Sequence, residues 1–536
     1  MADGNTLYYG DNLEILRRYI ADESVDLIYL DPPFNSAQDY NVLFKEQDGS
    51  RAASQIKAFE DTWRWDEAAA LAFQETVERG GQVSRALLGF RSFLGDTDML
   101  AYLSMMAPRL VELRRVLKPT GSIYMHCDPT ASHYLKMLMD SIFGPDQFLN
   151  EIIWQRSTPK GHAFTRYASS HDVLLFYARD KSATRWNPSF LPHNEKYLES
   201  HYNRIDTDNG RRYRLDNCLN PNPNRPNLTY EWNGLTRVWR WTKERMQRLH
   251  DEGRLVYSKS GMPQYKRYLD EMTGTPVTSV WTDIPPINSQ AAERLGYPTQ
   301  KPEALLERIL SASCNEGDTV LDPFCGCGTT IAAAQKLKRR WIGIDITHLA
   351  ITLIRHRLHD SFGDSVQYKV IGEPVSVADA QALAVADRFQ FQWWALGLVD
   401  ARPIEQKRGA DQGIDGRLYF HDEGPKGTTK QIILSVKSGG VSVKDVRDLR
   451  GVIDREKAAI GVLITLEDST KPMRSEAASA GFYNSPWGTK HPVLQILTIE
   501  ELLDGKGIDY PHHTNKTFKQ APRKKTGDKS KQGEML

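Results

Sequence analysis

Residues 321–330 read Leu-Asp-Pro-Phe-Cys-Gly-Cys-Gly-Thr-Thr, and this stretch decides the fold class. The apolar residues 319–321 predict a buried strand and residues 329–337 predict a helix, so Gly326 and Gly328 lie in the turn between them. Glycine lets the backbone approach a ligand closely, and the N-terminus of a helix offers free N–H groups. The stretch therefore predicts a strand–turn–helix unit that holds a ligand at its turn.

The next strand, expected over residues 341–344, ends at Asp345, nineteen residues beyond Gly326. A carboxylate in this position can hold ribose hydroxyls. The spacing differs from G-x-G-x-x-G, so it favours a nucleoside without a pyrophosphate over a dinucleotide; a plain tight turn is the alternative. Cys325 and Cys327 could belong to a metal site, but without a second pair, small side chains in a crowded turn explain them better.

A second motif, Asp31-Pro-Pro-Phe34, follows the apolar run 25–30. Its two prolines end the predicted strand. A carboxylate and a proline carbonyl can both accept hydrogen bonds from one exocyclic amine, and the aromatic ring can stack on the base that carries it. Such acceptors make the amine nitrogen nucleophilic towards an electrophilic methyl group, through positioning and electrostatics. For this motif alone, a plain turn is the alternative.

Strands and helices alternate along much of the chain, which predicts a parallel α/β sheet. The expected strands lie at 6–9, 25–30, 121–126, 319–321 and 341–344, and the expected helices at 52–117, 134–143, 302–313 and 329–337. Pro302 is expected at the first position of its helix, where its missing N–H has no cost.

Residues 155–280 interrupt this alternation with a different composition. They hold 21 Lys and Arg against 13 Asp and Glu, with 16 aromatic residues interleaved. The stretch 220–226 is rich in Pro and Asn and predicts an irregular loop. A solvated charged face is the ordinary explanation of such a segment, and a nucleic-acid surface is the alternative.

A third region begins near residue 378. Helices are expected over 380–398 and 443–453, and strands at 418–420, 431–436 and 461–466, with a Gly/Lys turn between the first two strands. Beyond Pro511 the chain has seven Lys and Arg, two acidic residues and almost no apolar content, which predicts a disordered basic tail over 511–536.

The composition of the whole chain is that of a globular protein with several domains. It has 536 residues, of which 26% are charged, and a net charge of +1. This excludes a collagen, a wholly disordered chain and a disulfide scaffold. The five cysteines fit reduced thiols in the cytoplasm. A signal peptide is not expected, and no apolar run approaches the roughly 20 residues of a membrane span, so no membrane partner is expected.

Five motifs, in a fixed order, resemble those of the N6-adenine/N4-cytosine DNA methyltransferase family. They are residues 9–16, 25–35, 121–128, 297–303 and 320–345. The catalytic motif precedes the cofactor loop, which is the order of the β group of this family. The resemblance covers about residues 5–360. It implies S-adenosylmethionine as methyl donor and a permuted Rossmann-like α/β fold with a seven-stranded sheet.

The resemblance also implies roles for particular residues. Asp31, Pro32, Pro33 and Phe34 would form the catalytic motif, and methyl transfer would need no metal. The cofactor site would be lined by Asp11, Thr299, Gln300, Lys301, Asp322, Phe324, Gly326, Gly328 and Asp345. Members with Asp at the first catalytic position are mostly adenine-N6 enzymes and those with Ser are mostly cytosine-N4 enzymes, so Asp31 favours adenine.

The same resemblance implies double-stranded DNA as the substrate. A base stacked inside a duplex cannot be reached, so the target base must be flipped out. Residues 155–280 lie where this group inserts its target-recognition region, which favours the nucleic-acid surface for that segment. The sequence leaves open whether the protein has a restriction or defence partner protein and whether it forms a homodimer.

Residues 385–505 resemble the Mrr-like branch of the PD-(D/E)-x-K nuclease fold, a smaller α/β domain. An acid such as Asp415 and a lysine such as Lys437 on neighbouring strands can hold Mg²⁺ and orient an attacking water. However, Ser435 stands where an acid or glutamine is usual, and a hydroxyl is a poor Mg²⁺ ligand. Glu405 or Asp411 could compensate, so a Mg²⁺ nuclease and an inactive DNA-binding or docking module both stay open.

Together these features predict a DNA methyltransferase domain over residues 1–372, with the insertion 155–280, and a nuclease-fold domain over residues 380–510. The expected function is site-specific methylation of DNA in a restriction–modification or defence system. Adenine N6 is favoured over cytosine N4 as the target. The alternatives are an enzyme that also cuts DNA and a non-catalytic DNA-binding protein with a vestigial cofactor fold. The expected function requires Asp31 and Gly326 to share one pocket, within about 15 Å.

Overall fold

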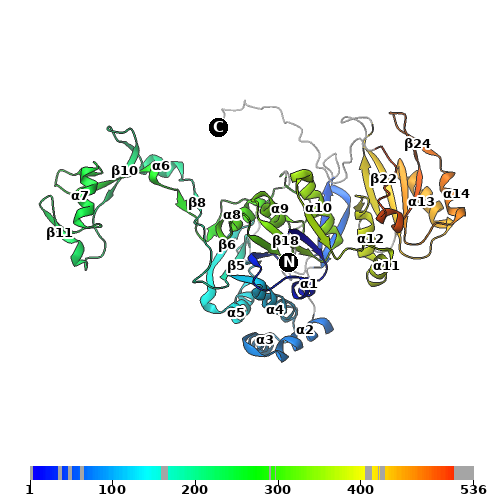
Figure 1. Cartoon of the computed structure of the whole chain (residues 1–536), viewed down its shortest axis with the longest axis horizontal. Coiled ribbons are helices and arrows are strands. Elements are labelled where there is room, and N and C mark those ends of the chain that lie inside the picture. Colours follow the sequence, from blue (N-terminus) through cyan, green and yellow to red (C-terminus); the bar gives the residue numbers. More distant parts are fainter. Residues whose placement is uncertain are drawn as a thin grey trace. The chain divides into compact units, whose positions relative to one another are not determined.

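The structure is a computed structural model that describes residues 4–33, 39–45, 51–60, 65–157, 167–288, 291, 293–295, 297, 299–404, 413–420, 422 and 429–511. Phe34, Glu405, Asp411 and the tail beyond Pro511 lie outside the described residues. The chain forms two compact units, one from Met1–Asn187 with Ser279–Leu536 and one from Pro188–Thr278 (Figure 1).

A sheet of nine strands among the described residues forms the centre of the first unit (Figure 1). In spatial order the strands are β16 (Val280–Trp281), β6 (Phe148–Gln155), β7 (His171–Ala178), β5 (Leu117–Cys127), β2 (Val25–Leu30), β17 (Thr319–Asp322), β18 (Arg340–Asp345), β1 (Asn5–Tyr9) and β19 (Tyr368–Ile371). Every pairing is parallel except those of β7, which runs antiparallel to β5 and β6.

The expected α/β class is confirmed, but the sheet is mixed and not wholly parallel, because β7 runs antiparallel to its neighbours, and the expected count of seven strands is wrong. The two additional strands, β16 and β19, lie at the two edges of the sheet. β16 begins where the chain returns after the unit Pro188–Thr278, and β19 lies just before the C-terminal region. Both cover main-chain groups that an edge strand would otherwise leave unpaired, which is a common way to protect a sheet edge.

Helices cover this sheet and bury its apolar side chains; α2 and α3 do so as an outer layer that packs on α4 and α5. They are α1 (Asn12–Tyr19), α2 (Glu67–Glu78), α3 (Gly81–Leu94), α4 (Asp98–Val116), α5 (Ser132–Phe143), α8 (Glu303–Ser313), α9 (Thr329–Lys336) and α10 (His348–Phe362). Leu103, Leu110 and Leu135 are fully buried in the same core as Ile28 and Ile123 of the strands. Burial of each such side chain contributes about 1.5–3 kcal/mol. Within the described ranges, no helix combines the length and the apolar character needed to cross a membrane.

Two helix predictions in this unit need correction. Residues 52–60 are not helical, because β4 (Arg51–Glu60) pairs antiparallel with β3 (Asp39–Lys45); a hydrogen-bonded ladder overrides the weak helix propensity of an Ala-containing stretch. Pro302 is the residue before the first helical one, since its ψ of 138° is extended and α8 begins at Glu303.

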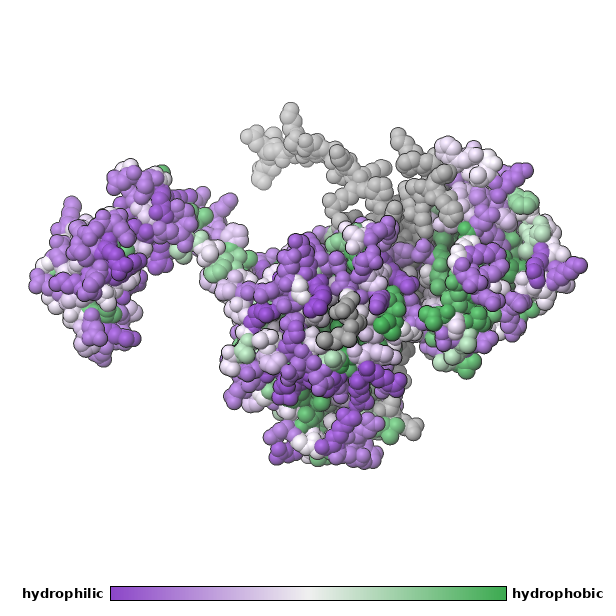
Figure 2. Space-filling view, viewed as in Figure 1, coloured by the Kyte–Doolittle hydropathy of each residue, from purple (hydrophilic) through white to green (hydrophobic). Residues whose placement is uncertain are grey.

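The unit Pro188–Thr278 has a small core of its own. Its elements are β8 (Phe190–Leu191), α6 (Glu195–His201), β9 (Arg204–Ile205), β10 (Arg212–Asn217), β11 (Thr229–Trp232), β12 (Leu235–Val238), α7 (Lys243–Asp251), β13 (Leu255–Tyr257), β14 (Pro263–Tyr268) and β15 (Thr275–Pro276). Trp239 and Met246 are fully buried there. Figure 2 shows that the face in view is mostly hydrophilic, as the basic composition predicts.

The C-terminal region forms a second, smaller sheet in the order β20 (Arg402–Pro403), β21 (Gly416–Phe420), β22 (Lys430–Lys437), β23 (Ile460–Thr465) and β26 (Leu494–Thr498). The further elements are α13 (Val443–Glu456), α14 (Lys471–Ala478), β24 (Phe482–Asn484), β25 (Lys490–Pro492) and α15 (Ile499–Leu503). The Gly/Lys turn expected between β21 and β22 lies largely outside the described residues.

The single helix expected over 380–398 is instead two helices, α11 (Val377–Ala386) and α12 (Arg388–Gly397). Asp387 separates them with an extended backbone, and its side chain accepts hydrogen bonds from the N–H groups of Phe389 and Gln390. A side chain that caps a new helix N-terminus satisfies donors that a continuous helix would use internally. The apolar run alone gives no sign of this break.

Four neighbouring strands bring the sequence motifs to one edge of the main sheet. β2, β17, β18 and β1 are adjacent and parallel, so their carboxyl ends point the same way. Asp31 follows β2, residues 323–328 (the glycine loop) follow β17, and Asp345 ends β18. Ligand sites of parallel α/β sheets form at this edge.

Gly328 gives a test of how closely the glycine loop packs against α10. Its φ is +74°, and an added Cβ would lie 2.7 Å from Cγ1 of Ile354, which is fully buried in α10. Gly328→Ala should therefore lower the free energy of unfolding by roughly 2–4 kcal/mol, through backbone strain and overpacking. Denaturant unfolding measures this loss.

Gly317→Ala is the matched control, because Gly317 has a φ of +83° with open space around its added Cβ. In that variant the free energy of unfolding should fall only by the cost of backbone strain, about 1–2 kcal/mol. Equal losses in the two variants would contradict close packing of the loop against α10.

Candidate active site

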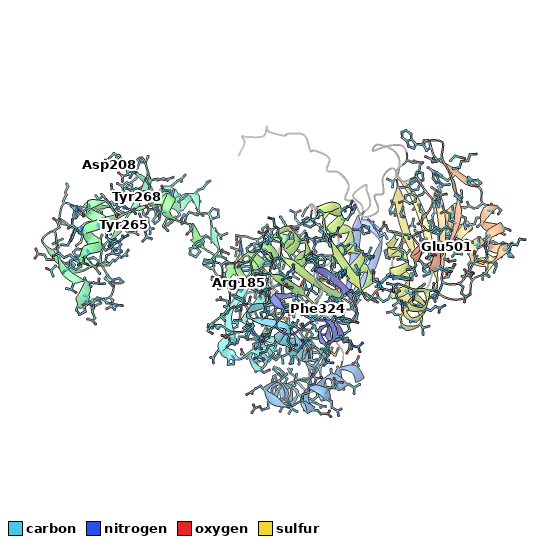
Figure 3. All side chains as sticks on the ribbon, in the orientation of Figure 1. Arg185, Asp208, Tyr265, Tyr268, Phe324 and Glu501 are labelled. Atoms are coloured by element: carbon cyan, nitrogen blue, oxygen red, sulfur yellow. The ribbon has the colours of Figure 1, made fainter. Side chains whose placement is uncertain are left out.

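A pocket of about 260 Å³ opens at the carboxyl edge of the main sheet. Its walls include most of the residues that the sequence assigned to the catalytic motif and the cofactor: Asp11, Asp31, Pro32, Pro33, Thr299, Gln300, Lys301, Asp322, Phe324, Gly326 and Asp345. Figure 3 labels Phe324 in the main body of the molecule. Gly328 is not in the wall and instead precedes α9. Asp31 and Gly326, far apart in the chain, therefore face one pocket.

The glycine loop is shaped by positive φ angles and by hydrogen bonds within the loop. Gly326 has a φ of +47°, and a Cβ there would lie 3.2 Å from the ring of Tyr297. The N–H of Gly328 donates to the carbonyl of Cys325 over 2.7 Å, and the N–H of Cys325 donates to the carbonyl of Ile344 over 3.1 Å. The loop is thus tied to β18, and a larger residue at either glycine would disturb it.

Asp345 holds this loop in place with its carboxylate. One oxygen accepts from the N–H of Gly326 over 2.9 Å, and the other accepts from the N–H and hydroxyl of Thr347 over 2.9 and 2.8 Å. Burial raises the pKa of Asp345 to about 6, against the opposing effect of these hydrogen bonds. The side chain is therefore ionised at neutral pH and becomes protonated in mildly acidic solution.

Asp322, at the end of β17, is the most deeply buried of the predicted cofactor residues. It is 2% exposed, and its carboxylate accepts from the N–H of Phe324 over 3.0 Å. Burial raises its pKa to about 7. Its position under the loop makes it a support for the backbone turn.

The two cysteines of the loop fit the crowded-turn interpretation. Cys325 and Cys327 are both buried, and burial raises the pKa of each thiol. The sulfur of Cys325 lies 3.2 Å from where a Cβ on Gly343 would stand. In the described part of the chain, no group of three or more His, Cys, Asp or Glu residues could hold a metal ion. Small side chains in a tight space thus account for both residues.

Arg109 is a pocket residue that the sequence did not reveal. It lies in α4, 6% exposed, and its guanidinium donates to Asp11 over 2.7 Å and to Asn12 over 2.6 Å. Asn12 in turn donates to the carbonyl of Pro323 over 2.8 Å. The only sequence signal was an arginine within the apolar stretch 100–110. Arg109 thus ties α4 to the start of α1, and Asn12 ties the start of α1 to the glycine loop.

Lys301 contacts the catalytic motif directly. Its ammonium lies 2.5 Å from Oδ2 of Asp31, and Lys301 is 8% exposed. The other carboxylate oxygen, Oδ1 of Asp31, is buried and has no hydrogen-bond partner among the described residues. A buried acceptor without a partner is costly, so its presence at the edge of a pocket points to a donor on a ligand. Sequence alone assigned Lys301 to the cofactor.

The nuclease-like residues of the C-terminal sheet lie together, but they are occupied by structural contacts. Asp415 is 6% exposed, and its Oδ2 accepts from the N–H of Val436 over 2.7 Å and from the hydroxyl of Ser435 over 3.2 Å. Lys437 ends the same strand. Glu405 and Asp411, the expected compensating acids, lie outside the described residues.

Many basic residues of the unit Pro188–Thr278 form ion pairs with acidic neighbours. Arg211 pairs with Asp270 and Glu271, and Arg254 pairs with Glu271; both guanidinium groups lie over the ring of Tyr268. Their charge is thus largely balanced within the unit. The net basic composition of the segment comes from other side chains.

Comparisons with known proteins agree with this geometry. Residues 25–355 match the family described as DNA methylase, and residues 390–504 match a family described as NACHT-associated inactive Restriction Endonuclease 1. The chain is similar to type II methyltransferase M.EcaI of Enterobacter cloacae, with 32% identity over 261 residues, which are 48% of this chain and 57% of the relative. The first two curated relatives are matched over 57% and 55% of their length.

Two further comparisons extend over more of the methylase region. DNA adenine methyltransferase YhdJ of Escherichia coli K12 is 23% identical over 356 residues, 66% of this chain and 83% of the relative. The solved complex of M1.HpyAVI with SAM is 17% identical, covers 66% of this chain and 98% of its own, and has a TM-score of 0.31. Because the DNA methylase family matches more than half of the sequence, this chain belongs to the N6/N4 DNA methylase family.

Proposed function

We propose that this protein is a site-specific DNA methyltransferase that transfers a methyl group from S-adenosylmethionine to an exocyclic amine of a flipped-out base. The observation that carries the proposal is the free Oδ1 of Asp31 in the same pocket as the glycine loop. An acceptor for the target amine and a loop for a nucleoside then lie within one small space. Such a close arrangement replaces a bimolecular encounter by a positioned reaction.

The pocket fits a positively charged cofactor. Its wall carries the four carboxyl groups of Asp11, Asp31, Asp322 and Asp345, against the two cations of Arg109 and Lys301. Asp345 would accept from the ribose hydroxyls, while Phe324 and the 299–301 stretch would line the rest. When bound, S-adenosylmethionine supplies a methyl group on a cationic sulfur, which an amine can attack directly. The excess of acidic groups favours this ligand by electrostatics.

The catalytic motif would bind the target amine through two acceptors. Oδ1 of Asp31 and the carbonyl of Pro32 would each accept one N–H, which turns the nitrogen lone pair towards the methyl group. The ion pair with Lys301 holds Oδ2 of Asp31 and so fixes the direction of Oδ1. Because both acceptors are placed before the base arrives, they cost no reorganisation during the reaction. Phe34 would stack on the base.

Adenine N6 is the favoured target, and cytosine N4 is the alternative. Asp stands at the first position of the catalytic motif, which the family resemblance associates with adenine. YhdJ, a relative matched over most of its length, is named a DNA adenine methyltransferase. Both features support N6 methylation.

Recognition of the DNA is proposed to lie in the inserted segment, residues 155–280, whose compact part is Pro188–Thr278. Lys and Arg there would contact phosphates, and a few side chains would read base edges. The domain boundaries proposed from the sequence, 1–372 and 380–510, are consistent with the two family matches at 25–355 and 390–504. A restriction–modification system is the proposed setting.

The C-terminal domain is proposed to bind DNA or a partner protein without cutting. Its family is described as inactive, and Ser435 replaces the metal-binding acid. The carboxylate of Asp415 is engaged by Ser435 and by the backbone of Val436, which leaves less of it for a cation. Mg²⁺ is therefore not part of the proposal.

The methyltransferase proposal predicts methyl incorporation into DNA. The protein should transfer the label of tritiated S-adenosylmethionine to DNA from a methylation-deficient host. Asp31→Ala should reduce the rate by at least about 10²-fold, because it removes a positioned acceptor from the transition state. The control is Asp96→Ala, which removes an exposed carboxylate paired with Arg91 and should leave the rate unchanged.

Nucleoside analysis of the product then identifies the base. N6-methyladenine is expected, whereas N4-methylcytosine would overturn the assignment of the base but keep the enzyme class. If the wild type incorporates no methyl group into DNA of any sequence, the methyltransferase proposal is refuted.

Cofactor binding should depend on pH through Asp345. Its pKa of about 6 is raised above the ordinary value, so the carboxylate is lost as the pH falls through 6. The apparent Kd for S-adenosylmethionine, measured by calorimetry, should be constant above pH 7 and rise up to about tenfold per pH unit below 6. Asp345→Asn should bind weakly at every pH without this change.

Asp322→Asn is the matched control, since Asp322 is a second buried carboxyl of the same wall. This variant keeps Asp345, so its affinity for S-adenosylmethionine should still fall in acidic solution. If Asp322→Asn removes the decline and Asp345→Asn does not, the ribose is not held by Asp345.

The inactive C-terminal domain predicts that no DNA cleavage depends on it. Wild type and Lys437→Ala, each incubated with Mg²⁺ and either methylated or unmethylated DNA, should leave the DNA intact on agarose gels. Cleavage by the wild type that is lost in Lys437→Ala would establish a bifunctional enzyme instead.

A further inference from the structure

A chain of three buried polar side chains runs from the pocket into the sheet. The hydroxyl of Tyr29, on β2, lies 2.8 Å from Nδ1 of His126, on β5. Nε2 of His126 lies 3.1 Å from Oδ2 of Asp172, on β7. Tyr29 lines the pocket two residues before Asp31. Neither His126 nor Asp172 belongs to the motifs assigned above to catalysis or cofactor binding.

The hydrogen-bond direction along this chain follows from the charge of Asp172. Burial alone would raise its pKa, but the hydrogen bond with His126 and the charges of Lys301 and Arg156 hold it below its usual value. An ionised carboxylate only accepts, so Nε2 of His126 carries a proton, and in the neutral form of the ring Nδ1 is an acceptor. Tyr29 must then donate to Nδ1. Burial raises the pKa of Tyr29 well above its ordinary value, so its hydroxyl stays protonated.

This order of carboxylate, imidazole and hydroxyl is the arrangement that lets an imidazole take a proton from a hydroxyl at an active site. The site needs such an acceptor. An amine that gains a methyl group becomes cationic and must lose a proton, and Asp31 is already proposed to hold the amine through Oδ1 while its Oδ2 pairs with Lys301. A neutral imidazole has a nitrogen lone pair that can accept a proton, so it can act as the base.

We propose that Tyr29, His126 and Asp172 form a proton relay that takes up the proton lost by the target amine. This inference rests on the proposed methyltransferase function. The C–N bond forms as the C–S bond breaks, with its electron pair left on sulfur. One of the two N–H bonds then turns from its acceptor to the oxygen of Tyr29 and breaks, its proton passes to that oxygen, and the proton of Tyr29 passes to Nδ1 of His126. The imidazolium is stabilised by Asp172 and returns the proton to solvent after the product leaves.

Charged and titratable groups surround the relay on every side. They are Asp31 after β2, Asp172 on β7, Arg156 after β6, Lys301 before α8 and Asp322 on β17. The ring of Trp154, on β6, meets the ring of His126 edge-on, with 5.9 Å between centroids. Arg156, whose side chain is 40% exposed, lies 3.2 Å from Asp172 and joins this end of the relay to solvent.

The alternative is that His126 and Asp172 only satisfy each other inside the sheet. His126 is fully buried and Asp172 is 2% exposed, so an apolar pair would avoid their desolvation. A purely structural pair would alter stability when it is broken. It would not alter the pH dependence of the methyl-transfer step.

The test is the pH profile of single-turnover methyl transfer from tritiated S-adenosylmethionine to DNA from a methylation-deficient host. Enzyme saturated with cofactor separates this profile from the titration of Asp345. The wild-type rate should fall in acidic solution, because a charged imidazole ring cannot accept the proton of Tyr29. His126→Asn, which keeps a polar group but no base, should be at least about tenfold slower and should lack this acidic decline.

Two tyrosines on neighbouring strands provide a matched pair of variants. Tyr29 and Tyr124 are register partners on β2 and β5, and both are buried. The hydroxyl of Tyr124 bonds to Ser313 over 2.6 Å and is not part of the pocket. Tyr29→Phe should slow single-turnover transfer at least about tenfold, whereas Tyr124→Phe should leave the rate unchanged. Unfolding temperature and cofactor binding show whether each variant is folded.

Each outcome decides whether His126 and Asp172 belong to a proton relay or form a purely structural pair. A flat single-turnover profile of the wild type, or equal rates for Tyr29→Phe and Tyr124→Phe, would overturn the relay even if His126→Asn fails to fold. Active wild type with an unchanged His126→Asn profile refutes only the relay. Wild type that never methylates DNA refutes the proposed function, and the relay falls with it.

Discussion

The parallel pairing of β2 with β17 is the constraint on which the site depends. Leu27 lies opposite Val320 and Ile28 opposite Leu321, so two strands almost 300 positions apart run side by side in the buried sheet. Each strand ends in one half of the chemistry: Asp31 after β2 and the glycine loop after β17. Parallel neighbours need long crossover connections, and the helices that provide them also bury the faces of the sheet. A shift of one residue in this register would turn the side chains of one strand to the opposite face.

The electrostatics of the pocket follow from the same convergence. Strand ends bring four carboxyl groups into a space of about 260 Å³. Asp11 and Asp31 have ion pairs with Arg109 and Lys301, while Asp345 is bonded mainly to backbone N–H groups and the buried Asp322 accepts from the N–H of Phe324. Burial accordingly raises the pKa values of the last two. A site that concentrates acidic groups in this way favours a cation, and its free acceptor on Asp31 favours an amine beside it.

The two other parts of the chain differ in how much chemistry they retain. The unit Pro188–Thr278 has a small aromatic core, and some of its Lys and Arg side chains form ion pairs within the unit, so base reading would depend on basic side chains outside these pairs. The C-terminal sheet keeps the strands and the Asp415–Lys437 pair of a nuclease fold, but its carboxylate bonds to its own neighbouring strand.

The sequence by itself determined the α/β class, the strand–turn–helix at residues 319–337, Asp345 at its strand end and the catalytic motif after residues 25–30. These features depend on local periodicity, glycine and proline, which act within a few residues. Tertiary structure alone decided the edge strands β16 and β19, the β3–β4 hairpin in place of a helix, and the break at Asp387. It also brought Arg109 to Asp11, Lys301 to Asp31 and His126 to Tyr29. Such contacts join residues far apart in the chain, and their geometry is set by which strands pair and in what register.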